Sequence, residues 1–450
     1  MSKPDVVAAL EARGVKHVKV GGFDIDGVLR GKYMSLDKLA SALESGFGFC
    51  DVIFGWDVAD TLYDEASVTG WERGFPDALA IIDPQTERDL PWEPHTALFV
   101  ADFRTDTGDP HPACPRSLLR AMRDRALAMG FEAKFSAEYE FFFFKETPDS
   151  LAEKGYVGLD TLTPGMFGYS VLRSGQNREL MADILDHMAA FEVPIEGLHT
   201  ETGPGVYEAA IHYDEVLASA DRAALFKVGL KQIAREHGIS VTFMAKWNAS
   251  LPGTSGHLHQ SLWQGGKNAF ATDGEMSDVM RHYVGGLCKL IPAMTAMVSP
   301  TVNSYKRYVP GVWAPLTASW GVENRTTAVR LIGRDAKTGK WGKGSRIEFR
   351  QTAADMNPYV AMAACLGAGL HGIEQAIEPP PEAKGDASEI GEPVPRSLGA
   401  AAEALAASET ARTIFGSAFV DHYVHTRRWE QAQYDKAVTD WELRRYFEVV

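Results

Sequence analysis

The sequence predicts an α+β fold in which a small β-rich N-terminal domain precedes a large α/β domain. Two strand-like segments at 17–25 and 28–34 flank an Asp-Gly pair, which is typical of a β-hairpin turn. Residues 106–115 contain three prolines, one glycine and two aspartates, and this composition indicates a domain boundary. After this boundary, helical and strand-like patterns alternate along the chain. We therefore expect domains at 1–108 and 109–450.

Besides the hairpin, the N-terminal part contains patterns for one short helix and two further strands. The helix is expected at 4–13. The apolar runs at 78–82 and 97–101 predict strands on either side of a proline-rich connection. These elements account for the β-rich character of this part of the chain.

The larger part contains patterns for both helices and strands. Helices are expected at 118–129, 177–191, 221–237, 280–297 and 359–377. Strands are expected at 134–144, 195–201, 241–246 and around residue 346. Pro292 predicts a kink in the helix that contains it. Residues 298–344 predict mainly loops, and the chain after residue 385 predicts further helices.

Composition excludes several classes of function. The 450 residues carry a net charge of −15, which argues against sequence-independent nucleic-acid binding, because such binding needs a basic surface. No apolar run is long enough to span a bilayer, and no apolar signal core follows the initial Met-Ser-Lys-Pro. We therefore expect a cytoplasmic protein without a membrane partner. The four cysteines are widely spaced, which favours reduced thiols over a zinc site or disulfides.

The segment 346–350 carries charges on one face of an expected strand. Alternate side chains of a strand point to opposite faces, so Arg346, Glu348 and Arg350 share a face while Ile347 and Phe349 fill the other. Burying three charges is costly unless metal ions or anionic ligands compensate them. This strand therefore predicts a binding site inside a sheet or barrel.

The segment 134–144 has the same design. Glu138 and Glu140 project from one face, and the other face is apolar, formed by Phe135, Ala137, Tyr139, Phe141 and Phe143. A lone Glu-x-Glu is usually a solvated strand face. Here the apolar partners indicate a buried strand, so the two carboxylates predict a metal site.

Two more segments add polar groups of the same kind. A glycine-rich turn between Glu201 and Glu208 allows two strands to present carboxylates close together, and His257, His259 and Ser261 share one face of a third expected strand. Five carboxylates with an imidazole suit two or three Mg²⁺ or Mn²⁺ ions. Nearby arginines suit phosphate and carboxylate groups. The four segments together therefore predict phosphoryl transfer.

Two further patterns suggest other phosphate chemistry, and both are weak. Asp24 and Asp26 match the opening motif of haloacid-dehalogenase-type phosphatases, but the acidic motif that completes the pattern is missing. The hairpin turn already explains Asp26-Gly27. A Gly-Lys pair within 333–341 has the wrong spacing for a P-loop, and Trp341 stands where Ser or Thr would bind magnesium.

Taken in order, these segments resemble the glutamine synthetase family, type I-like, over nearly the whole chain. The resemblance rests on the early Asp24-x-x-Gly27-x-x-Arg30-Gly31-Lys32, on Glu138-Tyr-Glu140, on Glu201 with Glu208, and on residues 253–261, 305–311, 324–330, 346–350 and 355–359. It implies an N-terminal β-grasp domain and a catalytic α/β barrel-like domain. It also implies a ring homo-oligomer, in this family a dodecamer, with active sites between subunits.

The resemblance further implies a reaction and roles for residues. ATP and glutamate would form γ-glutamyl phosphate, which an amine then attacks. One metal would be held by Glu140, Glu201 and Glu208, and the second by Glu138, His257 and Glu348. ATP would be surrounded by Glu196, His259, Ser261, Lys343 and Arg346. Glutamate would be held by Arg307, Arg350 and the backbone at Gly253, and the transferring phosphoryl group would be stabilised by Arg325 and Arg330.

The departures from the family pattern concern the nucleophile. Ammonia-using members carry a glutamate where Trp313 stands here, and an indole cannot accept a proton, although it can wall a hydrophobic pocket or stack on a cation. The aspartate that helps bind ammonium from the neighbouring subunit has only Asp57 and Asp60 as candidates. Pro252 replaces an asparagine near the glutamate.

These departures favour an ATP-dependent glutamate–amine ligase that forms a γ-glutamyl amide, with Trp313 and Trp56 as walls of the amine pocket and Asp57 as a catalytic group. A glutamine synthetase with an altered ammonium site is the alternative. A structural family member without catalysis and a dehalogenase-type phosphatase are distant alternatives. The amine itself is not specified by the sequence.

Overall fold

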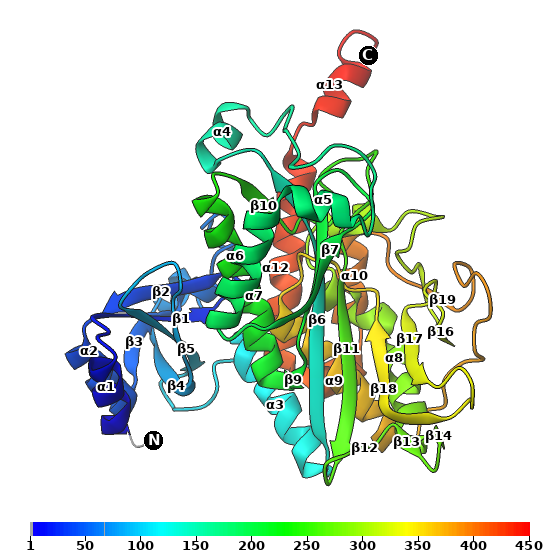
Figure 1. Cartoon of the computed structure of the whole chain (residues 1–450), viewed down its shortest axis with the longest axis horizontal. Helices are drawn as coiled ribbons and strands as arrows, with labels where there is room; N and C mark the ends of the chain where they lie inside the picture. Colours follow the sequence, from blue (N-terminus) through cyan, green and yellow to red (C-terminus); the bar gives the residue numbers. More distant parts are fainter. Residues whose placement is uncertain (1–2, 67) are drawn as a thin grey trace.

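The computed structural model describes residues 3–66 and 68–450. It contains two large sheets, one formed by the N-terminal part of the chain and the other by the larger part that follows (Figure 1). The first is five-stranded, with the order β2-β1-β5-β4-β3. Its strands are β1 (His17–Phe23), β2 (Leu29–Met34), β3 (Phe47–Cys50), β4 (Asp77–Asp89) and β5 (Thr96–Arg104). The predicted hairpin forms at the predicted turn, and β1 pairs in parallel with β5.

Two helices accompany the first sheet. They are α1 (Lys3–Ala12) and α2 (Leu36–Ser45), and short 3₁₀ turns follow at Asp51–Phe54 and Trp71–Arg73. Helix α2 is capped at its N-terminus by Ser35, whose hydroxyl accepts the backbone N–H of Lys38. Its apolar side chains join the core of this sheet. The arrangement agrees with the expected β-grasp domain.

The second sheet has ten strands and runs β16-β17-β18-β11-β6-β8-β7, with β9 and β10 also paired to β6 and β12 to β11. Its bounds are β6 (Glu132–Phe144), β7 (Ile195–Thr200), β8 (Val206–Ile211), β9 (Asp214–Glu215), β10 (Ser240–Thr242), β11 (Gly256–Gln264), β12 (Lys267–Asn268), β16 (Trp320–Val322), β17 (Val329–Arg334) and β18 (Trp341–Phe349). Two small two-stranded pairs are β13 (Ala271–Thr272) with β14 (Glu275–Met276), and β15 (Thr317–Ala318) with β19 (Glu392–Pro393).

Helices cover the apolar face of the second sheet. Phe135, Tyr139 and Phe141 of β6 are fully buried in the same core as residues of α3, α7 and α9. The helices are α3 (Pro115–Ala128), α4 (Pro148–Glu153), α5 (Val171–Gln176), α6 (Arg178–Ala190), α7 (Val216–Glu236), α8 (Asp278–Val298), α9 (Pro358–Glu374), α10 (Leu398–Ala406), α11 (Glu409–Phe415), α12 (Ser417–Lys436) and α13 (Asp440–Tyr446), with a 3₁₀ turn at Ser304–Arg307. The polar face of the sheet is left for ligands. No helix of the described residues is long and apolar enough to cross a membrane.

The prediction of loops at 298–344 was wrong for one important segment. Residues 329–334 form β17, which pairs antiparallel with β18. The segment is short and its apolar residues are interrupted by Arg330 and Gly333, so its own pattern is weak. Its strand conformation depends on the partner that β18 supplies. The expected strand at 241–246 is shorter than predicted, because only Ser240–Thr242 pair with β6.

The two parts of the chain meet at the β1–β2 turn. Asn357, just before α9, donates its side-chain amide to the carbonyls of Asp24 (3.2 Å) and Ile25 (3.1 Å). Gly27 has a φ of +82° and lies so close to Asn357 that a Cβ there would be 3.3 Å from its Cα. Arg427 of α12 pairs with Asp26 at 2.5 Å. The hairpin is therefore fixed against the larger domain.

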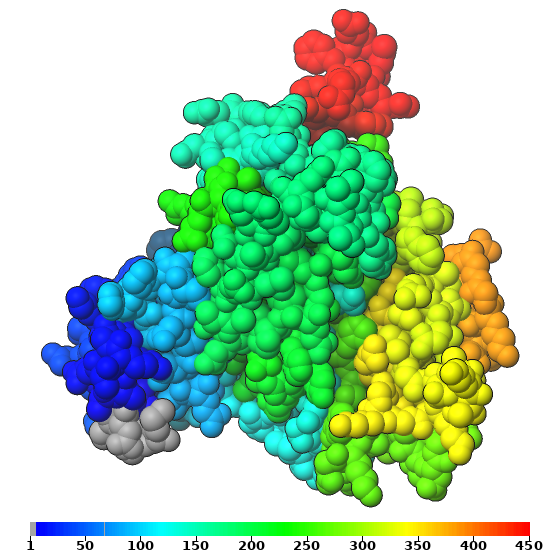
Figure 2. Space-filling view, in the orientation of Figure 1, coloured from blue at the N-terminus to red at the C-terminus, as the bar shows by residue number. Residues whose placement is uncertain are grey.

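The C-terminal segment stands away from the body of the molecule (Figure 2). It contains α13, which follows α12 and lies at the top of Figure 1 beside the C-terminus. Its exposed apolar residues include Trp441, Leu443, Phe447 and Val449. A segment with this composition needs another surface for burial.

Candidate active site

Strand register places the predicted polar residues next to one another. Glu140 lies opposite Glu208 on β8, and Glu138 lies opposite His257 on β11. The next pairs continue across the sheet, because Glu348 on β18 lies opposite both His259 and Arg330. Since side chains alternate along each strand, all of these groups face the same side of the sheet.

This face forms one cavity of about 1140 Å³, called the main cavity below. The predicted residues that line it are Glu138, Glu140, Glu196, Glu201, Glu208, His257, His259, Ser261, Trp313, Arg325, Arg330, Lys343, Arg346, Glu348 and Arg350. Three predicted site residues lie elsewhere, namely Gly253, Arg307 and Asp57. The sequence therefore located most of the lining of one cavity, while the role of each residue stays a prediction.

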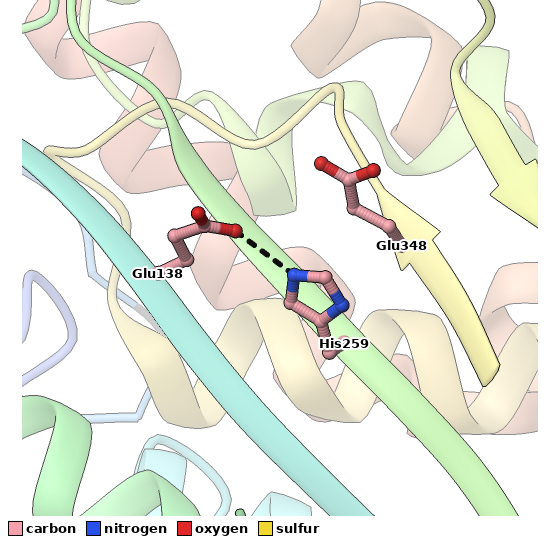
Figure 3. A group of neighbouring side chains, drawn as sticks. All are labelled: Glu138, His259 and Glu348. Atoms are coloured by element: carbon pink, nitrogen blue, oxygen red, sulfur yellow. Dashed lines mark hydrogen bonds and ion pairs between the residues drawn. The ribbon is translucent and has the colours of Figure 1, made fainter. Parts of the chain in front are cut away.

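Two groups of side chains in or beside the main cavity have metal-ligand spacing. Glu138, His259 and Glu348 come from three adjacent strands and bring their ligand atoms within 4.8 Å of one another (Figure 3). His259 Nε2 is 2.9 Å from Glu138 Oε2. The second group, with the same spacing, is His199, Glu201 and Glu208. The grouping differs from the predicted one, which used His257 and Glu140 in place of His259 and His199.

His257 and Glu140 lie beside these groups. His257 Nδ1 is 3.4 Å from Glu348 Oε1, and its buried Nε2 has no hydrogen-bond partner among the described residues. Burial and Arg350 lower the pKa of His257 to about 3, so its imidazole is neutral. Glu140 accepts the backbone N–H of Ser255 at 2.6 Å. Both residues remain within the lining of the cavity, so the predicted two-metal assignment stays a prediction.

Carboxylates crowd one side of the main cavity. Burial raises the pKa of Glu208, and the carboxylates of Glu138, Glu140 and Glu201 raise it further. Burial likewise raises the pKa of Glu140 to about 7. Clustered carboxylates, with imidazole beside them, are the kind of ligands that Mg²⁺ and Mn²⁺ use in proteins. The residues present therefore fit divalent metal ions.

Cationic side chains close the other side of the cavity. Glu348 accepts from Arg330 at 2.9 Å and also from Arg350. Burial opposes ionisation of Glu348, but the neighbouring guanidiniums of Arg350 and Arg330 lower its pKa. Arg346 Nε lies 3.3 Å from His259 Nδ1. The site thus changes from carboxylates to guanidiniums across three strands, an arrangement that suits metal-bound phosphate.

Arg307 lies beneath the cavity and is buried. Its terminal nitrogen donates to the carbonyls of Gln351 and Thr352, both at 2.8 Å. Its Nε and second terminal nitrogen have no hydrogen-bond partner within the described residues. Gly253 permits this packing, because a Cβ there would lie 2.8 Å from the Arg307 side chain. A buried guanidinium with free donors suits an anionic ligand.

Asp57 and Trp56 do not line the main cavity of their own chain. Asp57 accepts the backbone N–H groups of Ala59 (2.8 Å) and Thr61 (3.0 Å), and Trp56 stacks with Arg30 at 5.1 Å. Both belong to the N-terminal domain. The hypothesis that Trp56 and Trp313 jointly wall one pocket stays a prediction, because within one chain only Trp313 lines the main cavity.

The phosphatase alternative is also not supported. Asp24 accepts the backbone N–H groups of Asp26 and Val28 and the Nε of Arg30, and Asp26 pairs with Arg427. These bonds place both carboxylates in the structure of the hairpin turn and its contact with α12. Neither carboxylate lines the main cavity.

One residue beside the main cavity, His199, and several of its lining residues were missed. His199 has its Nε2 3.1 Å from Glu208 and its ring stacked on Tyr169, with centroids 4.5 Å apart. Lys134 and Ser136 also line the cavity, and their alternation with Phe135 on β6 could have identified them. Tyr169 lies in an irregular segment, where no periodicity marks it.

Comparisons with known proteins agree with the geometry. A family described as "Glutamine synthetase, catalytic domain" matches residues 112–446. The chain is 45% identical over 444 residues to a "Type-1 glutamine synthetase 2" of Dictyostelium discoideum, which covers 96% of this chain and 84% of the relative. It is 39% identical over 428 residues to a "Gamma-glutamylethanolamide synthetase GlnA4" of Streptomyces coelicolor, and this match covers 94% of this chain and 91% of the relative.

Solved structures show the same fold. A structure titled "GmaS/ADP complex-Conformation 1" aligns with a TM-score of 0.85 and 30% sequence identity. The alignment covers 98% of this chain and 99% of that one. Both sheets of the chain, with the cavity between β7 and β17, are therefore parts of a known architecture.

Proposed function

Because the chain belongs to the glutamine synthetase family of ATP-dependent ligases, we propose that it joins glutamate to an organic amine and forms a γ-glutamyl amide. Members of the family use ATP and divalent metal ions. The more specific assignment, to an amine instead of ammonia, is supported by one feature of the site. Trp313 lines the main cavity and leaves 69% of its side chain exposed.

The proposed reaction has two steps. A γ-carboxylate oxygen of glutamate attacks the terminal phosphorus of ATP, so that ADP leaves and γ-glutamyl phosphate forms. The amine, which has lost its extra proton, then attacks the γ-carbonyl carbon. The C–N bond forms, the C–O bond to phosphate breaks, and phosphate leaves with the electron pair. The second proton of the amine nitrogen passes to phosphate or solvent.

The proposed roles follow the position of each residue in the cavity. Bound divalent ions would neutralise the phosphates of ATP, and they would be held by Glu138, Glu140, Glu201, Glu208, His257 and Glu348. ATP would be surrounded by Glu196, His259, Ser261, Lys343 and Arg346. Two or three Mg²⁺ or Mn²⁺ ions suit this donor set.

The arginines would act on the anionic groups. Arg325 and Arg330 line the cavity and would stabilise charge on the transferring phosphoryl group. Arg350 and Arg307, with the backbone at Gly253, would hold the carboxylates of glutamate. The free donors of Arg307 support this role, since a buried guanidinium without an anion is costly.

Trp313 carries the choice of nucleophile. An indole offers no proton acceptor and no negative charge to hold ammonium, while its face and edge provide apolar area for the substituent of an amine. Glutamine synthesis from ammonia is the second candidate, and the 45% identity to a protein named glutamine synthetase favours it. The two candidates differ only in the nucleophile.

We also propose that the active chain is a ring homo-oligomer in the cytoplasm. In such a ring, Asp57 would act in the main cavity of a neighbouring copy, since it lies outside the cavity of its own chain. The exposed apolar residues of the C-terminal segment would be buried by another copy.

The experiment is phosphate release by the purified protein with ATP, Mg²⁺ or Mn²⁺ and glutamate. Ammonium is compared with methylamine, isopropylamine, ethanolamine, putrescine and aniline. We expect one amine to give a kcat/KM at least tenfold above that of ammonium. Ammonium as the best nucleophile would overturn the proposal and establish glutamine synthesis.

A substitution tests the role of Trp313 directly. Trp313→Glu is expected to lower the ratio of amine to ammonium kcat/KM, because it replaces apolar contact area by a carboxylate. Trp71→Glu, which changes an exposed tryptophan outside the cavity, is the control. An unchanged ratio in Trp313→Glu would refute the indole as the determinant of amine use.

A further inference from the structure

A second cavity adjoins the main one on the far side of Trp313. It has a volume of about 570 Å³, and two segments, 322–326 and 382–385, form its walls. Trp313 and Arg325 line both cavities. The two spaces therefore share one wall, made of an indole and a guanidinium, next to the proposed site of phosphoryl transfer.

The two walls of the second cavity are held together by hydrogen bonds. Asn324 donates its side-chain amide to the carbonyls of Ala383 (3.1 Å) and Gly385 (2.9 Å). Thr326 donates to Gly385 (3.1 Å) and accepts the backbone N–H of Ala387 (3.0 Å). These polar groups already have partners, so they build the cavity and are not free to select a ligand.

Two carboxylates of the lining keep acceptor capacity. Glu382 accepts one long bond of 3.4 Å from the backbone N–H of Val322, and its side chain is exposed. Glu323 pairs through one oxygen with Arg330 at 2.6 Å. Arg330 in turn donates to Glu348 at 2.9 Å, so the second cavity is connected by direct contacts to the main one.

The net charge of the second cavity does not favour a cation. Arg325 and Lys384 line it together with the two carboxylates, and their charges offset one another. Selection must therefore rest on directed hydrogen bonds between a donor group and a carboxylate oxygen. Such bonds to a charged acceptor are stronger than those between neutral groups.

The geometry points to the second cavity as the site for the substituent of the amine, with Glu382 as the residue that selects amines carrying a second hydrogen-bond donor. This inference rests on the proposed function. The reacting nitrogen would lie on the main-cavity side of Trp313, and the substituent would pass the indole. A hydroxyl group or a second ammonium group at its end would donate to Glu382.

The size of the cavity agrees with this class of substrate. Binding sites for small molecules have volumes of about 300–1,000 Å³, and the second cavity falls within that range. An amine with only a methyl substituent would leave the second cavity filled by solvent. A chain of two to four carbons with a terminal donor reaches farther and exchanges solvent hydrogen bonds for one to a carboxylate.

The test compares amines on variants of the lining. Glu382→Leu removes the acceptor, and we expect the kcat/KM for ethanolamine and putrescine to fall about tenfold relative to methylamine. Lys384→Trp places a larger side chain at an exposed position of the second cavity. Because it reduces the space for the substituent, we expect it also to lower the kcat/KM for ethanolamine and putrescine relative to methylamine. Glu389→Leu changes an exposed glutamate of the same connection outside the cavity and serves as the control.

The outcomes separate this inference from the proposed function. Wild-type protein that uses only ammonium would overturn the proposed function, whatever the variants show. Wild-type protein that uses amines, with ratios unchanged in both Glu382→Leu and Lys384→Trp, would overturn the second cavity as the selecting site alone. A fall for ethanolamine but not putrescine would assign a hydroxyl donor, and the reverse would assign an ammonium donor.

Discussion

Two buried clusters of charge in this chain are built in opposite ways. Arg116 on α3 is fully buried and donates to Asp221 (2.8 and 2.9 Å), Asp102 (2.9 Å) and Asp83 (2.9 Å). Burial alone would lower its pKa, but Asp221 and Asp102 raise it well above the usual value. In the main cavity, by contrast, carboxylates crowd one side, where burial raises the pKa values of Glu140 and Glu208 and neighbouring carboxylates raise them further.

The difference shows what each cluster is for. The Arg116 cluster joins β4 and β5 of the first sheet to α7 of the catalytic domain, and Tyr359 completes it with a hydrogen bond of 2.6 Å to Asp221. Ion pairs made within the chain join the two domains at a defined contact. Carboxylates crowded together suit a bound cation, and groups with pKa values raised in this way mark the active site.

The largest effect is expected from breaking the Arg116 cluster. Arg116→Met leaves the buried Asp221 without its cation, while Asp83 and Asp102 keep Arg120, so the free energy of unfolding should fall by about 3–5 kcal/mol. Urea denaturation measures it. Arg123→Met on the same helix, which removes only a pair with its neighbour Asp124, is the control and should change little. Equal losses in both variants would contradict the distinction.

The next largest effect concerns the crowded carboxylates of the main cavity. Glu208→Gln keeps the size of the side chain but removes a carboxylate that a divalent ion would use. Stabilisation by Mg²⁺, about 2.7 kcal/mol at a hundredfold excess over Kd, should therefore be lost. Thermal unfolding with and without Mg²⁺ measures it, and Glu389→Gln should keep the full shift. A normal Mg²⁺ shift in Glu208→Gln would argue against this residue as a ligand.

A third buried region is sensitive to acid. Burial and Arg73 lower the pKa of His111 to about 4, below its ordinary value of 6.5, so the unfolded chain binds more protons between these values. Stability is complete above about pH 6.5 and falls as the pH drops, by about 2 kcal/mol from this group at pH 5. Thermal unfolding from pH 8 to 5 measures the loss.

His111→Asn isolates this contribution. The asparagine cannot take up a proton, so its stability should vary less with pH over the same range. His422 faces His111, His425 and Arg427, and burial lowers its pKa as well, so part of the acid sensitivity should remain. The same pH dependence in wild type and His111→Asn would show that His111 is not responsible.

The smallest effect is expected at an exposed pair of the same chemistry as Arg116. Arg428 on α12 makes two bonds of 2.7 Å to Glu403 on α10, and both side chains are largely exposed. Arg428→Gln should cost less than about 1 kcal/mol, because water and salt replace the pair. Urea denaturation would show it, and a loss as large as that of Arg116→Met would contradict the role given to burial.

The sequence specified the fold class and most of the cavity lining, because the signal was local. Alternation on 134–144 and 346–350 requires only that each segment be a strand, and β6 and β18 are strands. The fold class and family were confirmed by the comparisons. The domain boundary and the role of each site residue stay predictions.

The rest depended on contacts between distant segments. The residues of β17 carry a weak pattern of their own and become a strand beside β18, which brings Arg330 to Glu348. His199 joins Glu201 and Glu208 only through the pairing of β7 with β8. Asp57 and Trp56 were assigned to the cavity by resemblance, and no local pattern could show which chain's cavity they face.

The contact between Asn357 and the β1–β2 turn has a consequence for synthesis of the chain. The hairpin is made early, but its partner Asn357 lies 333 residues later and its partner Arg427 lies 401 residues after Asp26. At about 5–20 residues per second, the ribosome needs on the order of tens of seconds to reach them. During that interval the Asp26 carboxylate has no guanidinium from α12, so the hairpin turn is held only by its own hydrogen bonds until the rest of the chain has emerged.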